Sequence, residues 1–150
     1  MGIEMIPTAS IGWDLTNVPT YLRSVLNARI RSYRDLLVWQ RSMDLVDAVY
    51  DATESFPRHE IYALTAQLRR AAVSIPSNIA EGHGRGRPRE YLHHVSIANG
   101  SLMEVETQAA IACRRSYLTA ETEAAILVHS SEVGRMVAGL ARALKRRISS

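Results

Sequence analysis

Apolar positions recur at helical spacing along most of the chain, and the segment after Pro88 shows this best. Steps of four and three alternate there for about three heptads, the packing pattern of a helix in a bundle. The repeat comprises Tyr91, Val95, Ala98, Leu102, Val105, Ala109 and Ala112. Pro88 fits the first turn of this helix, because a proline there removes no helical hydrogen bond.

Two earlier segments have the same spacing and predict two more helices. The first begins with Asp35 as its N-cap and ends before Pro57. Its main apolar stripe comprises Leu36, Trp39, Met43, Val46 and Tyr50. The second starts near Arg58, runs to Gly82 or Gly84, and continues beyond Pro76 with a kink or local break there. Its stripe comprises Ile61, Leu64, Leu68, Ala72, Ile75 and Ile79.

A fourth helix is predicted after Thr119, whose side chain can cap it. Its heptad positions are Leu127, Ser130, Gly134, Val137, Ala141, Leu144 and Ile148. Short turns between long helices enforce antiparallel neighbours. Residues 33–148 are therefore expected to form an all-α, up-down-up-down four-helix bundle domain. Residues 1–32 contain scattered Pro, Gly and Asn, and they read as a loosely structured leader or a short helix near residues 21–30.

Two of the helices carry a second apolar line beside the main stripe. These lines comprise Val38, Leu45 and Val49 in the first helix and Ile126, Val133 and Leu140 in the fourth. Surface of this kind predicts that another subunit covers it, so we expect a homo-oligomer. The alternative is a wide stripe that faces the core of the same chain.

Composition narrows the class of protein. Apolar residues make up 47% and charged residues 22% of 150, which is typical of a soluble globular domain. The single cysteine, Cys113, excludes an internal disulfide and is expected to be a small buried hydrophobe. No apolar run reaches the ~20 residues that a membrane span requires. Glu4 and Pro7 do not fit a secretory signal, so a cytoplasmic location is expected.

Charge is strongly segregated, although the net formal charge is only +3. The first helix is acidic, whereas residues 69–89 and 135–150 are basic. Antiparallel order brings the turn after residue 82 and the C-terminus of the last helix to one end. A basic end is typical of a protein that contacts a phosphate backbone. The predicted nucleic-acid-binding residues are Arg85, Arg87, Arg89, Arg142, Lys145, Arg146 and Arg147. The alternative is that the terminal cations only complement the helix dipole.

A line of polar residues follows the second helix and faces a similar line on the third. We expect a structural polar layer, either between helices or between subunits, in which paired charges fix register. Its members are Gln67, Arg70, Ser74, Asn78, Glu81 and Glu104. The sequence has no His-x-x-x-His or Glu-x-x-His pair and no nucleophile–base set. We therefore expect no metal, no cofactor and no catalytic residues, and a protein that is not an enzyme.

Several runs resemble the bacterial family of 23S rRNA intervening-sequence proteins over about residues 34–148. They are Val38-Trp39-Gln40, Phe56-Pro57, the long run from Glu60 to Gly82, Glu90-Tyr91 and the segment from Gly100 to Glu104. The resemblance implies a small helical bundle with no established catalytic activity. The fold is shared with the accessory protein of diversity-generating retroelements, a basic homopentameric barrel that binds nucleic acid and a reverse transcriptase.

The resemblance therefore implies a pentamer that acts as an RNA- or DNA-binding scaffold. The alternative function is a protein–protein adaptor whose oligomer surface recruits a partner such as a reverse transcriptase, without direct contact to nucleic acid.

Overall fold

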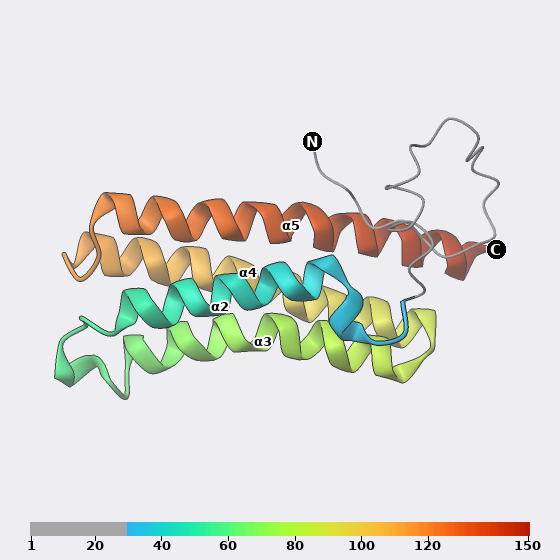
Figure 1. Ribbon diagram of the computed structural model, residues 1–150, viewed down its shortest axis with the longest axis horizontal. Helices are drawn as coiled ribbons and strands as arrows, with labels where there is room; N and C mark the ends of the chain where they lie inside the picture. The colour runs from blue at the N-terminus through green and yellow to red at the C-terminus, as the bar shows by residue number, and fades with distance from the viewer. Residues whose placement is uncertain (1–29) are drawn as a thin grey trace.

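A computed structural model describes residues 30–150 as four α-helices and two short 3-10 turns (Figure 1). The elements are η2 (Tyr33–Asp35), α2 (Leu37–Thr53), η3 (Arg58–Glu60), α3 (Leu64–Arg85), α4 (Pro88–Arg114) and α5 (Ala120–Ser149). No strand occurs in this part of the chain. α2 packs against α3 and α5, and α4 packs against the same two helices, which makes an antiparallel four-helix bundle. The predicted leader and its short helix fall outside the described residues, except for residues 30–32.

The heptad pattern of α4 is confirmed. Pro88 is the first residue of the helix, and the predicted positions from Val95 to Ala112 are buried. Tyr91, at the start of the repeat, is partly buried. This face of α4 packs into the centre of the bundle, where alanines at positions 98, 109 and 112 allow the helices to approach closely.

In α2 and α5 the second apolar lines lie in the core, so the prediction that a subunit covers them is wrong. Val38, Leu45 and Val49 are at most 1% exposed, whereas Tyr50 of the supposed main stripe is 41% exposed. In α5 the core contains the whole second line, Ile126, Val133 and Leu140. Of the main line it contains only Ser130, Val137 and Leu144, and Leu127 is 36% exposed. Each of these helices has two neighbours in the bundle, and a helix between two neighbours needs a wide apolar face.

The start of α2 differs from the prediction, because Asp35 caps a different element. Its carboxylate accepts the backbone N–H groups of Arg31 (2.9 Å) and Ser32 (3.0 Å) and so closes the η2 turn. α2 then begins at Leu37, with Leu36 as an N-cap that offers no side-chain hydrogen bond.

α3 also begins later than predicted. Residues 58–60 form the separate turn η3, and Ile61 is 53% exposed. The Glu60 carboxylate accepts the backbone N–H of Leu64 at 3.1 Å and so caps the first turn of α3. The helix then continues without a break through the buried Pro76 to Arg85, and Gly86 ends it with a left-handed φ of 70°.

The end of the bundle that carries the α2–α3 and α4–α5 connections is closed by side chains. The hydroxyl of Tyr117 donates to the Glu60 carboxylate at 3.2 Å, and its ring packs 5.7 Å from that of Phe56. Thr119 then caps α5, as predicted, by accepting the backbone N–H of Thr122 at 3.1 Å. Among residues 30–150, none of the helices is both long and apolar enough to cross a bilayer.

Candidate nucleic-acid interface and the α3–α4 seam

The two basic segments lie at the same end of the bundle, as the antiparallel order predicts. Figure 1 shows the α3–α4 turn and the C-terminus of α5 at one end, with the last turns of α5 reaching past that turn. The predicted contact residues there are all exposed, namely Arg85, Arg87, Arg89, Arg142, Lys145, Arg146 and Arg147. We call this group the basic end.

Two arginines of the basic end are paired with neighbouring carboxylates. Arg85 bonds to Glu81 at 2.7 Å, and Arg87 bonds to Glu90 at 3.2 Å. The hydrogen bond from Arg85 is the main reason why the pKa of Glu81 lies below its ordinary value, with the nearby His94 as a second cause. Both pairs are exposed, and exposed pairs contribute little to stability. They offset the charge of Arg85 and Arg87 but not that of Arg89, so the turn keeps only a small positive charge.

The net positive charge of the basic end is concentrated on α5. Within the described part of the chain, Arg142, Lys145, Arg146 and Arg147 form no ion pair, and no carboxylate follows Glu132 in the sequence. Cations at the C-terminus of a helix are favoured by its dipole. Four cations along two turns also give a strong local positive potential, which attracts a polyanion.

Sequence reasoning missed two further cations near this end, Arg31 and Arg34. Both are exposed; Arg31 precedes η2 and Arg34 lies within it, and η2 packs against α2 and α3. The guanidinium of Arg34 lies 5.4 Å from the ring centre of Tyr33 and 5.9 Å from that of Trp39. The sequence does contain a signal for this ordered turn, because Ser32 and Asp35 have the spacing of a capping box, and the structure shows both of its hydrogen bonds.

The predicted polar layer lies between α3 and α4. Half of it, namely Ser74, Asn78 and Glu81, is linked by hydrogen bonds and, at Glu81, by a longer contact with His94. Ser101 donates to Ser74 at 2.9 Å, and the Asn78 amide donates to the Ser74 hydroxyl at 3.1 Å. The Asn78 carbonyl oxygen lies 3.0 Å from Nδ1 of His94, whose Nε2 is 3.7 Å from Glu81. His94 was missed as a member of this layer, because its partner Asn78 becomes evident only once the register of α3 against α4 is known.

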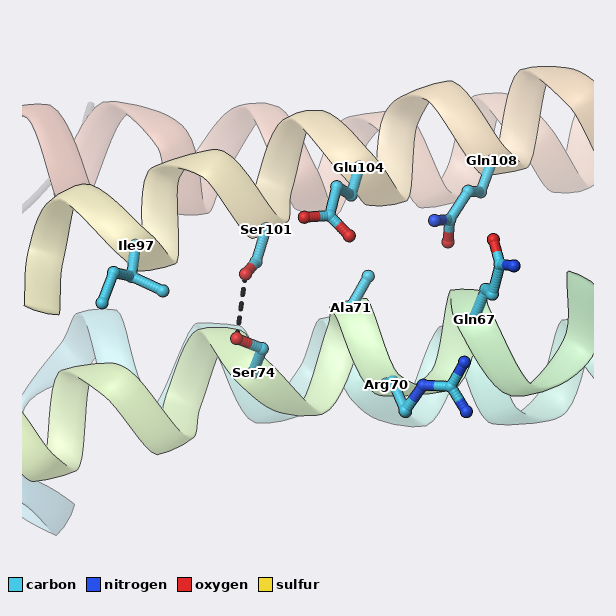
Figure 2. A pocket seen from close by; sticks show the side chains of 8 residues that line it. All are labelled: Gln67, Arg70, Ala71, Ser74, Ile97, Ser101, Glu104 and Gln108. Atoms are coloured by element: carbon cyan, nitrogen blue, oxygen red, sulfur yellow. Dashed lines mark hydrogen bonds between the residues drawn. The ribbon is translucent and has the colours of Figure 1, made fainter.

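The other half of the layer surrounds an open groove of about 360 Å³ on the surface of the seam (Figure 2). Its lining comprises Gln67, Arg70, Ala71, Ser74, Ile97, Ser101, Glu104 and Gln108. Figure 2 shows Glu104 pointing into the groove from α4, while Arg70 extends along α3 at its edge. No ion pair joins these two residues to each other or to the rest of residues 30–150. The predicted pairing of charges within the layer is therefore absent inside the described chain at Arg70 and Glu104.

Cys113 is the one cysteine of the chain, and its thiol is partly buried. The pKa of the Cys113 thiol is raised, first by a hydrogen bond with the Glu123 carboxylate and then by burial, which keeps it protonated. No group of three or more His, Cys, Asp or Glu side chains within residues 30–150 could hold a metal ion.

Fold and seam together define a small antiparallel four-helix bundle with a polar α3–α4 contact and a basic end. A family model described as 23S rRNA-intervening sequence protein matches residues 34–139. The chain belongs to this family, as the sequence runs predicted. A search of curated proteins found no match.

Proposed function

We propose that this protein is a non-enzymatic, homo-oligomeric scaffold in the cytoplasm that binds nucleic acid through its basic end. The observation that carries the proposal is the cluster of four exposed cations at the end of α5, none of which pairs with a carboxylate within residues 30–150. By contrast, the cations of the α3–α4 turn are partly matched by Glu81 and Glu90.

The expected contact is to the phosphate backbone. Exposed Lys and Arg side chains on a convex helix end reach phosphates and displace counterions, but they read no base edges. The binding should therefore be weakly selective for sequence and steeply dependent on salt. The name of the family, which refers to an intervening sequence of 23S rRNA, supports structured RNA as the first polyanion to test.

A matched pair of triple variants tests the proposal. The first variant, K145Q/R146Q/R147Q, removes three cations from the basic end. The control, R58Q/R114Q/R115Q, removes three exposed cations from the opposite end. Binding of a fluorescent structured RNA and of a DNA duplex is measured by anisotropy at about 50 mM salt, where phosphate contacts are strong.

We expect the first variant to lose most of its affinity while the control keeps it, with both forming the same oligomer. Equal loss in the two variants, or no binding by the unmodified protein, would overturn the proposal.

The second candidate function is an adaptor that recruits a protein, such as a reverse transcriptase, without direct contact to nucleic acid. Two observations favour it. Arg85 and Arg87 are used in pairing within the chain, and Val128 on α5 is 67% exposed. An unmodified protein that self-associates but binds neither RNA nor DNA at low salt would select this function.

A further inference from the structure

Arg70 and Glu104 are opposite charges that share one groove but have no ion-pair partner within residues 30–150. Both side chains are exposed, and they come from adjacent helices. Each residue is therefore free to pair with a charge outside the chain.

The two residues lie at nearly the same level along the bundle. The hydrogen bond between Ser74 and Ser101 fixes the register of α3 against α4. Arg70 is four residues before Ser74, and Glu104 is three residues after Ser101. Because the helices are antiparallel, both displacements point the same way, and at 1.5 Å per residue they are about 6 Å and about 4.5 Å. The levels thus differ by only about 1.5 Å.

We propose that the α3–α4 seam is an interface between copies of this chain, in which Arg70 of one copy pairs with Glu104 of the next. Rotation about an axis parallel to the helices leaves every residue at its own level. When the axis runs beside this seam, so that α3 of one copy lies next to α4 of another, these two residues are therefore opposite each other. The seam carries one positive and one negative residue, so the seams of two copies are complementary in charge. Such self-complementarity is what association of identical surfaces requires.

The surroundings of the pair fit this occupant. Ile97 (40% exposed) and Ile111 (44% exposed) flank Glu104 along α4, and Val73 (40% exposed) lies one turn from Arg70 on α3. These side chains would be covered when a second bundle packs here.

This inference rests on the homo-oligomer of the proposed function and assigns its contact residues. The test uses charge reversal in the full chain. Arg70→Glu places two acids on the seam, and Glu104→Arg places two bases there, so each variant alone should repel its own copies. A mixture of the two variants juxtaposes opposite charges at every contact between unlike copies. Only a contact between chains can be rescued in this way.

Sedimentation velocity over a concentration series measures the association, and circular dichroism confirms that each variant remains helical. We expect each single reversal to weaken self-association by about a hundredfold, because like charges placed opposite each other cost several kcal/mol. Mixing the two variants in equal amounts should restore most of it. The control reversals Asp47→Arg on α2 and Arg135→Glu on α5, exposed on the other two helices, should have no effect.

Three results would overturn the inference. If the mixture stays dissociated, the seam is not the interface. If both reversals leave association unchanged, the copies meet on another face. If the unmodified protein is a monomer at micromolar concentration, both this inference and the proposed homo-oligomer are wrong. The proposal that the basic end binds nucleic acid is tested separately, by the two triple variants. Milder variants, Arg70→Gln and Glu104→Gln, should each weaken association by about tenfold, and they replace a reversal that fails to fold.

Discussion

Gly82 in α3 lies directly beneath the ring of Tyr91 in α4. A Cβ atom at position 82 would overlap Cδ2 of Tyr91 and stand 2.9 Å from Cβ of His94. Both obstacles belong to the facing helix, so they are fixed by the core and cannot move aside freely. Glycine is needed here for close approach of the two helices.

The Gly82→Ala variant should therefore be destabilised. Overpacking of a close helix contact typically costs about 1–3 kcal/mol in the free energy of unfolding. The matched control is Gly134→Ala in α5, where a Cβ meets nothing within 4 Å. That variant should gain up to about 1 kcal/mol, because alanine favours a helix over glycine. Urea denaturation of both variants measures the difference, and equal stabilities would contradict the close contact.

Tyr91 should make stability depend on alkaline pH. Burial raises the pKa of its hydroxyl from 10.0 to about 12. The folded state then holds the proton more tightly than the unfolded state between these values. Its stability should be constant below pH 10 and fall by roughly 1–2 kcal/mol as the pH rises to 12.

The Tyr91→Phe variant should show a shallower fall over the same interval, and below pH 10 it should unfold with a free energy up to about 1 kcal/mol higher. The reason is that the buried hydroxyl has no hydrogen-bond partner in the described chain. A variant that is markedly less stable at neutral pH would show that the hydroxyl does have a partner.

Loss of the cap on α5 should destabilise the bundle. Thr119→Ala removes the side-chain oxygen that accepts the N–H of Thr122, at a typical cost of about 1 kcal/mol. Thr119→Asp keeps an acceptor and places a negative charge at the positive end of the helix dipole, so it should restore the midpoint of thermal unfolding. The prediction fails if the Ala and Asp variants unfold at the same temperature.

The salt dependence of nucleic-acid binding should report how many cations of the basic end contact phosphates. For duplex DNA, the slope of the logarithm of affinity against the logarithm of salt changes by about 0.9 for each contact. K145Q/R146Q/R147Q should make the slope shallower by up to about 2.7. The control R58Q/R114Q/R115Q should leave it unchanged, and an equal change in both would argue for diffuse attraction instead.

The helices and their order could be predicted from the sequence because the apolar periods are long and the turns are short. The sequence did not show which face of α2 is buried. Trp39, Met43 and Tyr50 count as apolar in a pattern, yet these large side chains lie at the edge of the core. The smaller Val38 and Val49 occupy its centre. Periodicity alone does not distinguish the two lines, since both have helical spacing.

The start of α3 and the polar layer show the same limit. Ile61 keeps the apolar period but is exposed, because it lies in the turn between η3 and the start of α3 at Leu64. The polar positions on α3 were identified correctly as a set. The register of α3 against α4 decides which of these residues form hydrogen bonds and which stay unpaired. Spacing within one helix does not reveal this register.

The last turns of α5 extend past the α3–α4 turn, so other helices of the bundle support them less. Residues 145–147 are exposed there, and Arg142 and Arg146 are like charges one turn apart, which opposes helix formation. An anion that neutralises them would also order this segment, and by reciprocity an ordered segment would hold the anion more tightly. Shortening of α5 after Leu144, or a helix breaker placed there, should thus weaken ligand affinity beyond the lost charges. Occupancy should in turn slow amide hydrogen exchange in these final turns.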